Sequence, residues 1–174
     1  MSNESADFIE VSICTDPWQT LDVDAFVCPT NSEGRLSHYP GSKILELAGI
    51  DVESPVASHA PVAVGAAVVT EAGHMRARHL VHVPNTETPG GRVMVEDVLR
   101  ATAAALVACE AKGFTSVAIP LMGAFDTGIP AEEAARAIHG EVRAFRATRP
   151  LKVLLLARNM DELEVFELAI EAAS

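Results

Sequence analysis

The chain has 174 residues, of which 49% are apolar and 21% are charged, a composition typical of a globular protein with a substantial core. Its formal net charge of −11 argues against a duplex nucleic-acid surface, which needs a basic face to neutralise phosphates. The N-terminal segment MSNESADFIE lacks the basic start and apolar run of a secretory signal, and every apolar stretch is shorter than a membrane span. We therefore expect a single domain over residues 1–174, in the cytoplasm and without a membrane partner.

Six short apolar or β-branched segments predict strands, several of them buried on both faces. They are Phe8–Cys14, Ala25–Cys28, Val62–Thr70, Leu80–Val83, Ser116–Leu121 and Lys152–Leu156. Four helices are expected at about Ser42–Leu47, at Val95–Lys112, after Pro130 and from Asp161 onward. The last of these has Glu164 three residues after Asp161, which is the spacing of a capping box. The alternation of strand and helix in the C-terminal half predicts a parallel sheet with helices on its faces.

The cysteines and histidines do not suggest a metal or disulfide site. Cys14, Cys28 and Cys109 are odd in number and lack a CxxC spacing, so we interpret them as buried thiols. His79 and His82 are three residues apart on a predicted strand and therefore point to opposite faces. We expect no metal.

Ligands of parallel α/β sheets lie at the C-terminal ends of the strands, in the loops that lead into helices. Two loops meet this condition, Pro29–Gly41 and Met122–Pro130. The second contains GAFDTG at Gly123–Gly128, where backbone N–H groups and glycines could hold a diphosphate. Taken alone, the same stretch also fits a plain turn between a strand and a helix.

Ordered motifs along the chain resemble the macro domain, a family of modules that bind ADP-ribose. The family typically carries V-D-A-I-V-N-A-A-N, then T-G-x-A, V-I-H and P-A-I-S-T-G-x-Y-G-Y-P. This chain reads VDAFVCPTNS at Val23–Ser32, VGAAVVT at Val64–Thr70, LVHV at Leu80–Val83 and SVAIPLMGAFDTGIP at Ser116–Pro130. The resemblance implies a three-layer α/β/α fold with a mixed, mostly parallel six-stranded sheet. It also implies ADP-ribose or a related small nucleotide as the ligand, an ADP-ribosylated protein as a partner, and no cofactor.

The resemblance places the ligand in a cleft between loops 29–42 and 122–130. Asn31 matches an Asn that usually contacts the distal ribose, although an Asn after a strand is also a common turn former. Asp16 matches the acidic residue beside the adenine amino group, or is a turn residue. Arg158 and Asn159 fall where many relatives approach the adenine, or Arg158 is a solvated side chain at a strand end. The other expected contacts are Ser32, Tyr39, Gly41, Ser42, Gly123, Ala124, Phe125, Asp126, Thr127 and Gly128.

Four positions depart from the family pattern. Cys28 replaces the first Asn of N-A-A-N, and Gly41 stands where hydrolytic members place an Asp that orients water. Phe125 replaces the middle glycine of the second phosphate loop, and Asp126 adds a carboxylate beside it. His38 and Asp126 are the candidates for a catalytic role, and each also fits an ordinary loop residue.

Three functions follow from these observations. The first is a binding module for ADP-ribose or a related nucleotide diphosphate. The second is a hydrolase that acts on ADP-ribosylated proteins or on O-acetyl-ADP-ribose. The third is a degenerate macro fold that serves protein interaction without binding ADP-ribose.

Overall fold

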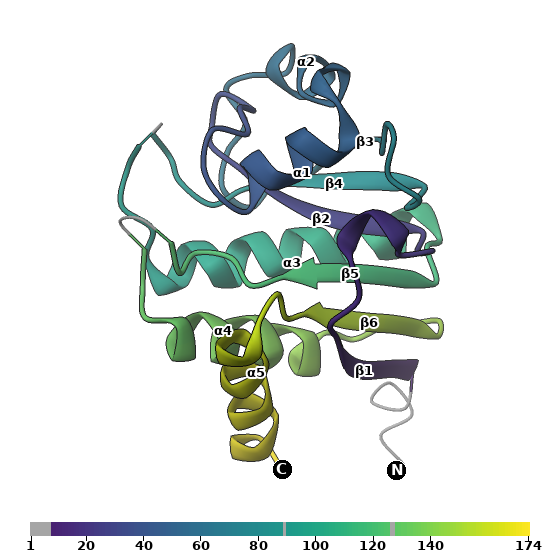
Figure 1. Cartoon of the computed structure of the whole chain (residues 1–174), viewed down its shortest axis with the longest axis vertical. Helices are drawn as coiled ribbons and strands as arrows, with labels where there is room; N and C mark the ends of the chain where they lie inside the picture. Colours follow the sequence, from purple (N-terminus) through teal and green to yellow (C-terminus); the bar gives the residue numbers. More distant parts are fainter. Residues whose placement is uncertain (1–7, 89, 126–127) are drawn as a thin grey trace.

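The computed structural model describes residues 8–88, 90–125 and 128–174. At its centre lies a six-stranded sheet in the order β1-β6-β5-β2-β4-β3 (Figure 1). Neighbouring strands run parallel except at one edge, where β3 pairs antiparallel with β4. The strands are β1 (Ile9–Cys14), β2 (Ala25–Thr30), β3 (Val68–Glu71), β4 (His79–Pro84), β5 (Ser116–Pro120) and β6 (Leu151–Leu156). This arrangement confirms the expected mixed, mostly parallel sheet.

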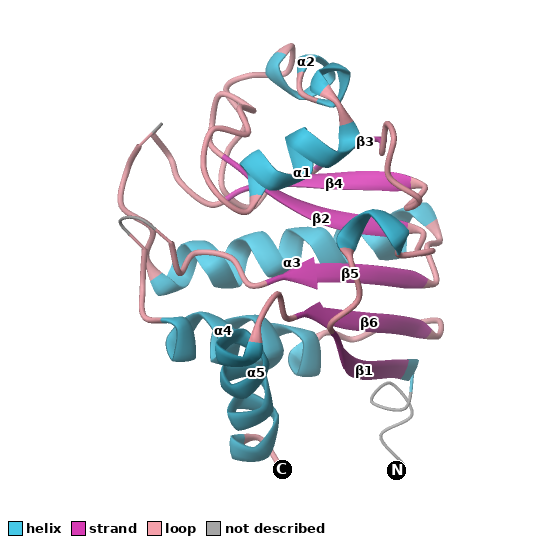
Figure 2. Ribbon diagram, in the orientation of Figure 1, coloured by secondary structure: helices cyan, strands magenta, loops and turns pink. Residues whose placement is uncertain are grey.

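Helices cover both faces of the sheet (Figure 2). They are α1 (Gly41–Ala48), α2 (Ser54–Ala57), α3 (Val95–Lys112), α4 (Ala131–Ala144) and α5 (Met160–Ala172), with short 3-10 turns at Trp18–Thr20 and Ile50–Val52. Alternate residues of the strands pack into two separate apolar cores, because successive side chains of a strand point to opposite faces. Val27 of β2 packs with α3, α4 and α5, whereas Phe26 and Cys28 pack with α1 and Trp18. The fold is therefore the three-layer α/β/α architecture.

The helical periodicity of the sequence is confirmed most clearly in α3. Val98, Thr102, Leu106 and Cys109 are fully buried, and they recur at the three- and four-residue spacing of one helix face. The Asp97 carboxylate accepts a hydrogen bond from the backbone N–H of Met94 at 2.8 Å, which satisfies a donor at the start of the helix.

Two predicted elements differ from the structure. The expected strand Val62–Thr70 is reduced to β3, since the backbone N–H of Val62 donates to the Ser32 carbonyl and Gly65 has a left-handed φ of 102° that interrupts an extended strand. The last helix begins at Met160, not at Asp161. Its N-cap is Asn159, whose side-chain oxygen accepts from the Glu162 N–H at 2.9 Å, so the cap lies two residues earlier than the spacing suggested.

The parallel strands end at a common edge, and this places three loops together. Thr30 of β2 is in register with Pro84 of β4, and β5 ends beside them. The loops that follow these strands gather at the same end of the sheet (Figure 2). Among the helices that the structure describes, none has the length and apolarity to cross a bilayer.

Candidate functional site

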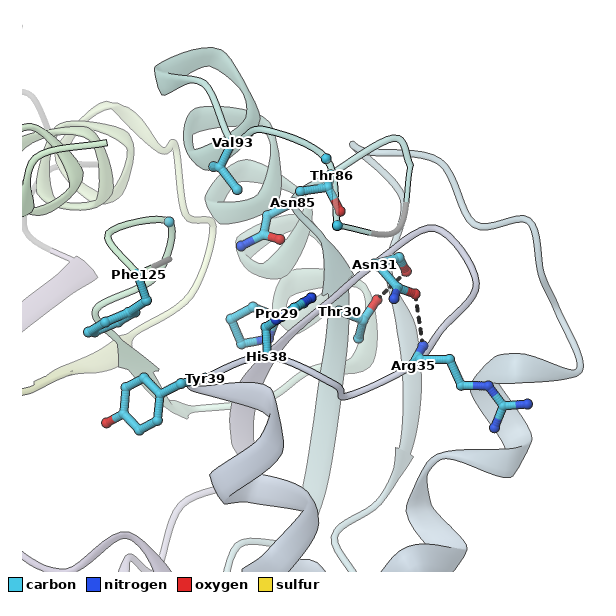
Figure 3. Close-up of a pocket in the computed structure, with 13 residues that line it drawn as sticks. Pro29, Thr30, Asn31, Arg35, His38, Tyr39, Asn85, Thr86, Val93 and Phe125 are labelled. Carbon is cyan, nitrogen blue, oxygen red and sulfur yellow. Dashed lines mark hydrogen bonds between the residues drawn. The ribbon is translucent and has the colours of Figure 1, made fainter. Parts of the chain in front are cut away.

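A pocket of about 120 Å³ lies at the C-terminal edge of the sheet, between the three loops (Figure 3). The loop after β2 forms one side, the loop after β4 forms the second, and the loop after β5 forms the third. We call this space the edge pocket. Its lining consists of Pro29, Thr30, Asn31, Arg35, His38, Tyr39, Asn85, Thr86, Gly90, Gly91, Val93, Gly123 and Phe125.

Asn31 organises the loop that follows β2. Its side-chain oxygen accepts a hydrogen bond from the backbone N–H of Glu33 at 3.0 Å. It accepts a second one from the backbone N–H of Arg35 at 3.1 Å (Figure 3). Its amide nitrogen lies 3.5 Å from the Ser37 hydroxyl. The turn-forming interpretation of Asn31 is thus correct, and the same residue also lines the edge pocket.

Glu53 holds this loop against the segment before α2. Its carboxylate accepts hydrogen bonds from the Leu36 N–H and from the Arg35 guanidinium, both at 2.8 Å. Partial burial acts to raise the pKa of Glu53, but the hydrogen bonds from Leu36 and Arg35 outweigh it and lower the pKa below its ordinary value. The negative charge of Glu53 therefore helps to fix the shape of one wall of the pocket.

Gly41 begins α1 directly against the end of β2. A Cβ atom at this position would lie 2.6 Å from the carbonyl oxygen of Pro29, well inside the ordinary contact distance. The position at which the family resemblance expects a catalytic Asp thus has no room for any side chain with the present backbone.

The loop after β5 is closed by backbone contacts. The Ile129 N–H donates to the Gly123 carbonyl at 2.8 Å, and a Cβ at Gly128 would overlap that same carbonyl. Gly123 has a φ of 82°, and a Cβ there would overlap the Val98 side chain of α3. Both glycines are thus required by the loop itself. Asp126 and Thr127, which the sequence places in this loop, lie outside the described residues.

Three side chains stack at the side of the edge pocket that faces β6. The rings of Tyr39 and Phe125 meet edge to face with centroids 4.6 Å apart. The Arg158 guanidinium lies 4.4 Å from the centre of the Tyr39 ring and 5.6 Å from that of Phe125. Burial raises the pKa of Tyr39 to about 12, so its hydroxyl stays protonated at neutral pH. We call Tyr39, Phe125 and Arg158 the stacked wall.

A second pocket, of about 350 Å³, lies on the other side of the stacked wall. It is shaped by the loop after β5 and by the first turns of α4 and α5, and Phe125 lines both pockets. Arg158 lines the second pocket and is held by Glu162, with a 3.0 Å ion pair and a further hydrogen bond from its Nε. Glu132, Asp161 and Glu164 add further carboxylates to a lining that also contains apolar side chains such as those of Leu121 and Val165.

The buried thiols and histidines lie outside both pockets. Cys28 and Cys109 are fully buried, which raises the pKa of each thiol, whereas Cys14 is only half-buried, contrary to the expectation from sequence. His82 is buried beside Thr70, with Nε2 2.8 Å from the hydroxyl oxygen, and burial lowers its pKa to about 4. Within the described ranges, no three His, Cys, Asp or Glu side chains are grouped as metal ligands.

Comparison with known proteins identifies the family. The family model described as Macro domain matches residues 27–138, which is more than half of the chain. An uncharacterised protein of Aquifex aeolicus is 36% identical over 147 residues, covering 84% of this chain and 89% of that protein. The chain belongs to the macro domain family.

Solved macrodomain structures agree in fold with this macro domain. The Oceanobacillus iheyensis macrodomain with MES bound has a TM-score of 0.80 at 14% identity, covering 95% of this chain and 91% of that one. The Trypanosoma brucei macrodomain in complex with ADP-ribose has a TM-score of 0.76 at 19% identity, covering 97% and 72%. The family and the fold that the sequence motifs implied are both confirmed.

The expected site residues of this macro domain that the structure describes, His38 as a catalytic candidate and the others as ligand contacts, fall into three groups. Asn31, His38, Tyr39, Gly123 and Phe125 line the edge pocket. Ala124, Arg158 and Asn159 line the second pocket, where Asn159 also caps α5. The lining of these two pockets does not include Asp16, Ser32, Gly41, Ser42 or Gly128 among the described residues. Gly41 and Gly128 shape the loops from behind, as the close approaches of their backbones show.

The third loop of the site was not predicted from the sequence. Asn85, Thr86, Gly90, Gly91 and Val93 follow β4 and line the edge pocket. The sequence does indicate this loop as a ligand site, because the segment follows a buried parallel strand, precedes a helix and contains a pair of glycines. The other two loops were predicted from the same position rule and from the family motifs that they carry.

Proposed function

We propose that this macro domain is a binding module for ADP-ribose or a related nucleotide diphosphate, held in the cleft between loops 29–42 and 122–130. The observation that carries the proposal is the edge pocket, which places Asn31, His38 and the glycine loop after β5 around one space at the C-terminal edge of a parallel sheet. The Trypanosoma brucei macrodomain, which has the same fold, is known in complex with ADP-ribose.

The charge of the lining is compatible with an anionic ligand although the chain is acidic. Among the residues that the structure describes, the edge pocket has no Asp or Glu in its lining. The N-terminal end of α1 lies near the pocket, since this helix starts two residues after Tyr39, and the positive end of its dipole favours anions there even though the Ser42 N–H already donates to the His38 carbonyl. Local dipoles rather than net charge would therefore bind the phosphates.

Calorimetric titration with ADP-ribose tests the proposal, and we expect micromolar affinity. Asn85→Ala should weaken binding by about tenfold, because its amide faces the pocket while its backbone N–H keeps the bond to Thr30. Gln19→Ala removes the same kind of amide from an exposed position outside the pocket and should bind normally. Bulky substitutions of Gly123 or Gly128 are poor probes, because they break the loop itself. Absence of heat and of thermal shift at millimolar ADP-ribose would refute the proposal.

A hydrolase is the second candidate, and the observation that favours it is His38, an imidazole in the lining of the edge pocket. The absence of a side chain at Gly41 means that a residue other than the usual Asp must orient the water. We expect His38→Ala or Asp126→Ala to abolish release of ADP-ribose from modified protein while affinity is retained. If the wild-type protein binds ADP-ribose but releases none from modified protein, the hydrolase is excluded and the binding module remains.

A role without any nucleotide is the third candidate, and the position of Phe125 bears on it. Phe125 packs against the apolar core and against Tyr39, and it borders the edge pocket rather than filling it. An open pocket beside Phe125 supports ligand binding over a degenerate fold.

A further inference from the structure

A groove of about 430 Å³ lies along α3, apart from the edge pocket and the second pocket. Gly65 and Ala67, which precede β3, form one side of this groove, and α3 forms the other. The lining is mostly small and apolar, and it includes Val107, whose side chain is 58% exposed. We call this space the α3 groove. An exposed apolar surface of this form typically marks a protein contact.

Small side chains leave the α3 groove open to a helix. Ala104, Ala108 and Ala111 line it together with Val107, and these positions recur at the three- and four-residue spacing of one helix face. Because an alanine side chain ends at Cβ, a second helix can approach α3 to an interaxial distance of about 8 Å, the short end of the usual range. A helix with one larger apolar side chain on its face therefore suits this groove.

The charges at the α3 groove are positive. Arg100 lines it, and Lys112 is exposed in the last turn of α3, directly after Ala111. Among the residues that the structure describes, the lining contains no carboxylate; Glu96, one turn before Arg100, lies outside it. Since the whole chain carries a net charge of −11, this groove is a local exception, and its charge is complementary to that of an acidic helix.

Helix α5 has the matching properties on its exposed side. Its exposed acidic residues are Asp161, Glu164, Glu167 and Glu171, and α5 contains no Lys, Arg or His. Leu168 is 49% exposed among these carboxylates, at a position that shares one helix face with Glu164 and Glu171. The exposed side of α5 is therefore complementary to the α3 groove both in charge and in the size of its apolar side chain.

The two surfaces lie at opposite edges of the sheet (Figure 1). The α3 groove adjoins the segment before β3, whereas α5 packs against α4 and β1, and β1 and β3 are the two edge strands. A chain therefore cannot place its own α5 in its own α3 groove. We propose that the α3 groove binds α5 of a second copy of this chain, in a head-to-tail contact that does not depend on the proposed nucleotide binding. Leu168 of one copy packs on the alanines of the next, and the carboxylates of α5 face Arg100 and Lys112.

Sedimentation equilibrium of the whole chain tests the inference. We expect the average mass to rise above 18.4 kDa with concentration, with a dissociation constant of roughly 10–100 µM, because a contact of this size is weak. Val107→Glu and Leu168→Glu should each weaken this association by at least about tenfold, since each places a carboxylate in the contact. Ile50→Glu is the matched control, because Ile50 is 80% exposed outside both surfaces, and it should associate as the wild type does. A monomer at every concentration, or equal association of all four proteins, would overturn the proposal and leave the groove to another partner or to none.

A mixture of the two variants tests the head-to-tail geometry. Val107→Glu retains an intact α5, and Leu168→Glu retains an intact α3 groove. Each variant alone should stay monomeric at a concentration at which their equimolar mixture forms a dimer and nothing larger, because only one competent contact remains. A mixture that stays monomeric at this concentration would show that the two surfaces do not bind each other.

Discussion

At the scale of single residues, Gly41 shows most directly how packing constrains the site. A Cβ at this position would lie 2.6 Å from the Pro29 carbonyl, so Gly41→Ala should lower the free energy of unfolding by about 1–3 kcal/mol, measured by urea denaturation. Gly140→Ala is the matched control, because a Cβ there has no neighbour within 4 Å; in this exposed helical position alanine should stabilise the protein by about 0.5–1 kcal/mol. Equal stability of Gly41→Ala and the wild type would mean that β2 can move away without cost. An Asp could then be placed at this position after all.

At the scale of elements, the loop after β2 depends on a neighbour that is distant in sequence. Glu53→Gln removes the charge that accepts from Leu36 and Arg35, and should lower the free energy of unfolding by about 1–3 kcal/mol. The same variant should weaken ADP-ribose binding, since this loop forms one side of the edge pocket. Glu33→Gln removes a charge from an exposed position in the same loop and should change neither quantity. Identical urea denaturation curves and ligand titrations for both variants would contradict this role of Glu53.

The elements that the sequence predicted are those with local signals. The strand β6 and the helix α3 follow from apolar periodicity within a few turns of chain, and the structure places both close to the expected bounds. The start of α5 was misplaced because two candidate caps lie two residues apart, and only the bond from Glu162 to Asn159 decides between them. In the site, Asn31, Tyr39 and Phe125 were indicated by motif position.

Other features of the site could not be predicted because they depend on contacts across the chain. The exclusion of a side chain at Gly41 depends on where β2 ends in space. The attachment of Leu36 depends on Glu53, seventeen residues later in the chain. The stacked wall joins Tyr39 and Arg158, which no local pattern relates. Such contacts are set by the packing of the two layers and not by the propensities of either segment.

At the scale of the whole molecule, the buried His82 links folding to pH. Burial lowers its pKa from 6.5 to about 4, although the charge of Glu53 acts in the opposite direction. Below about pH 6.5 the unfolded chain takes up a proton at His82 that the folded chain does not take up until about pH 4, so stability falls with falling pH across this window, by about 3 kcal/mol in total. Urea denaturation from about pH 7.5 to about pH 4.5 measures this slope.

His82→Asn should flatten the dependence of stability on pH, even if the variant is less stable overall, whereas His74→Asn at an exposed position should retain it. The comparison between the two variants separates His82 from His139, whose pKa burial also lowers, and from carboxylates such as Asp24 that protonate at lower pH. A wild-type slope in the His82 variant would show that this histidine is not the group that destabilises the fold in mild acid.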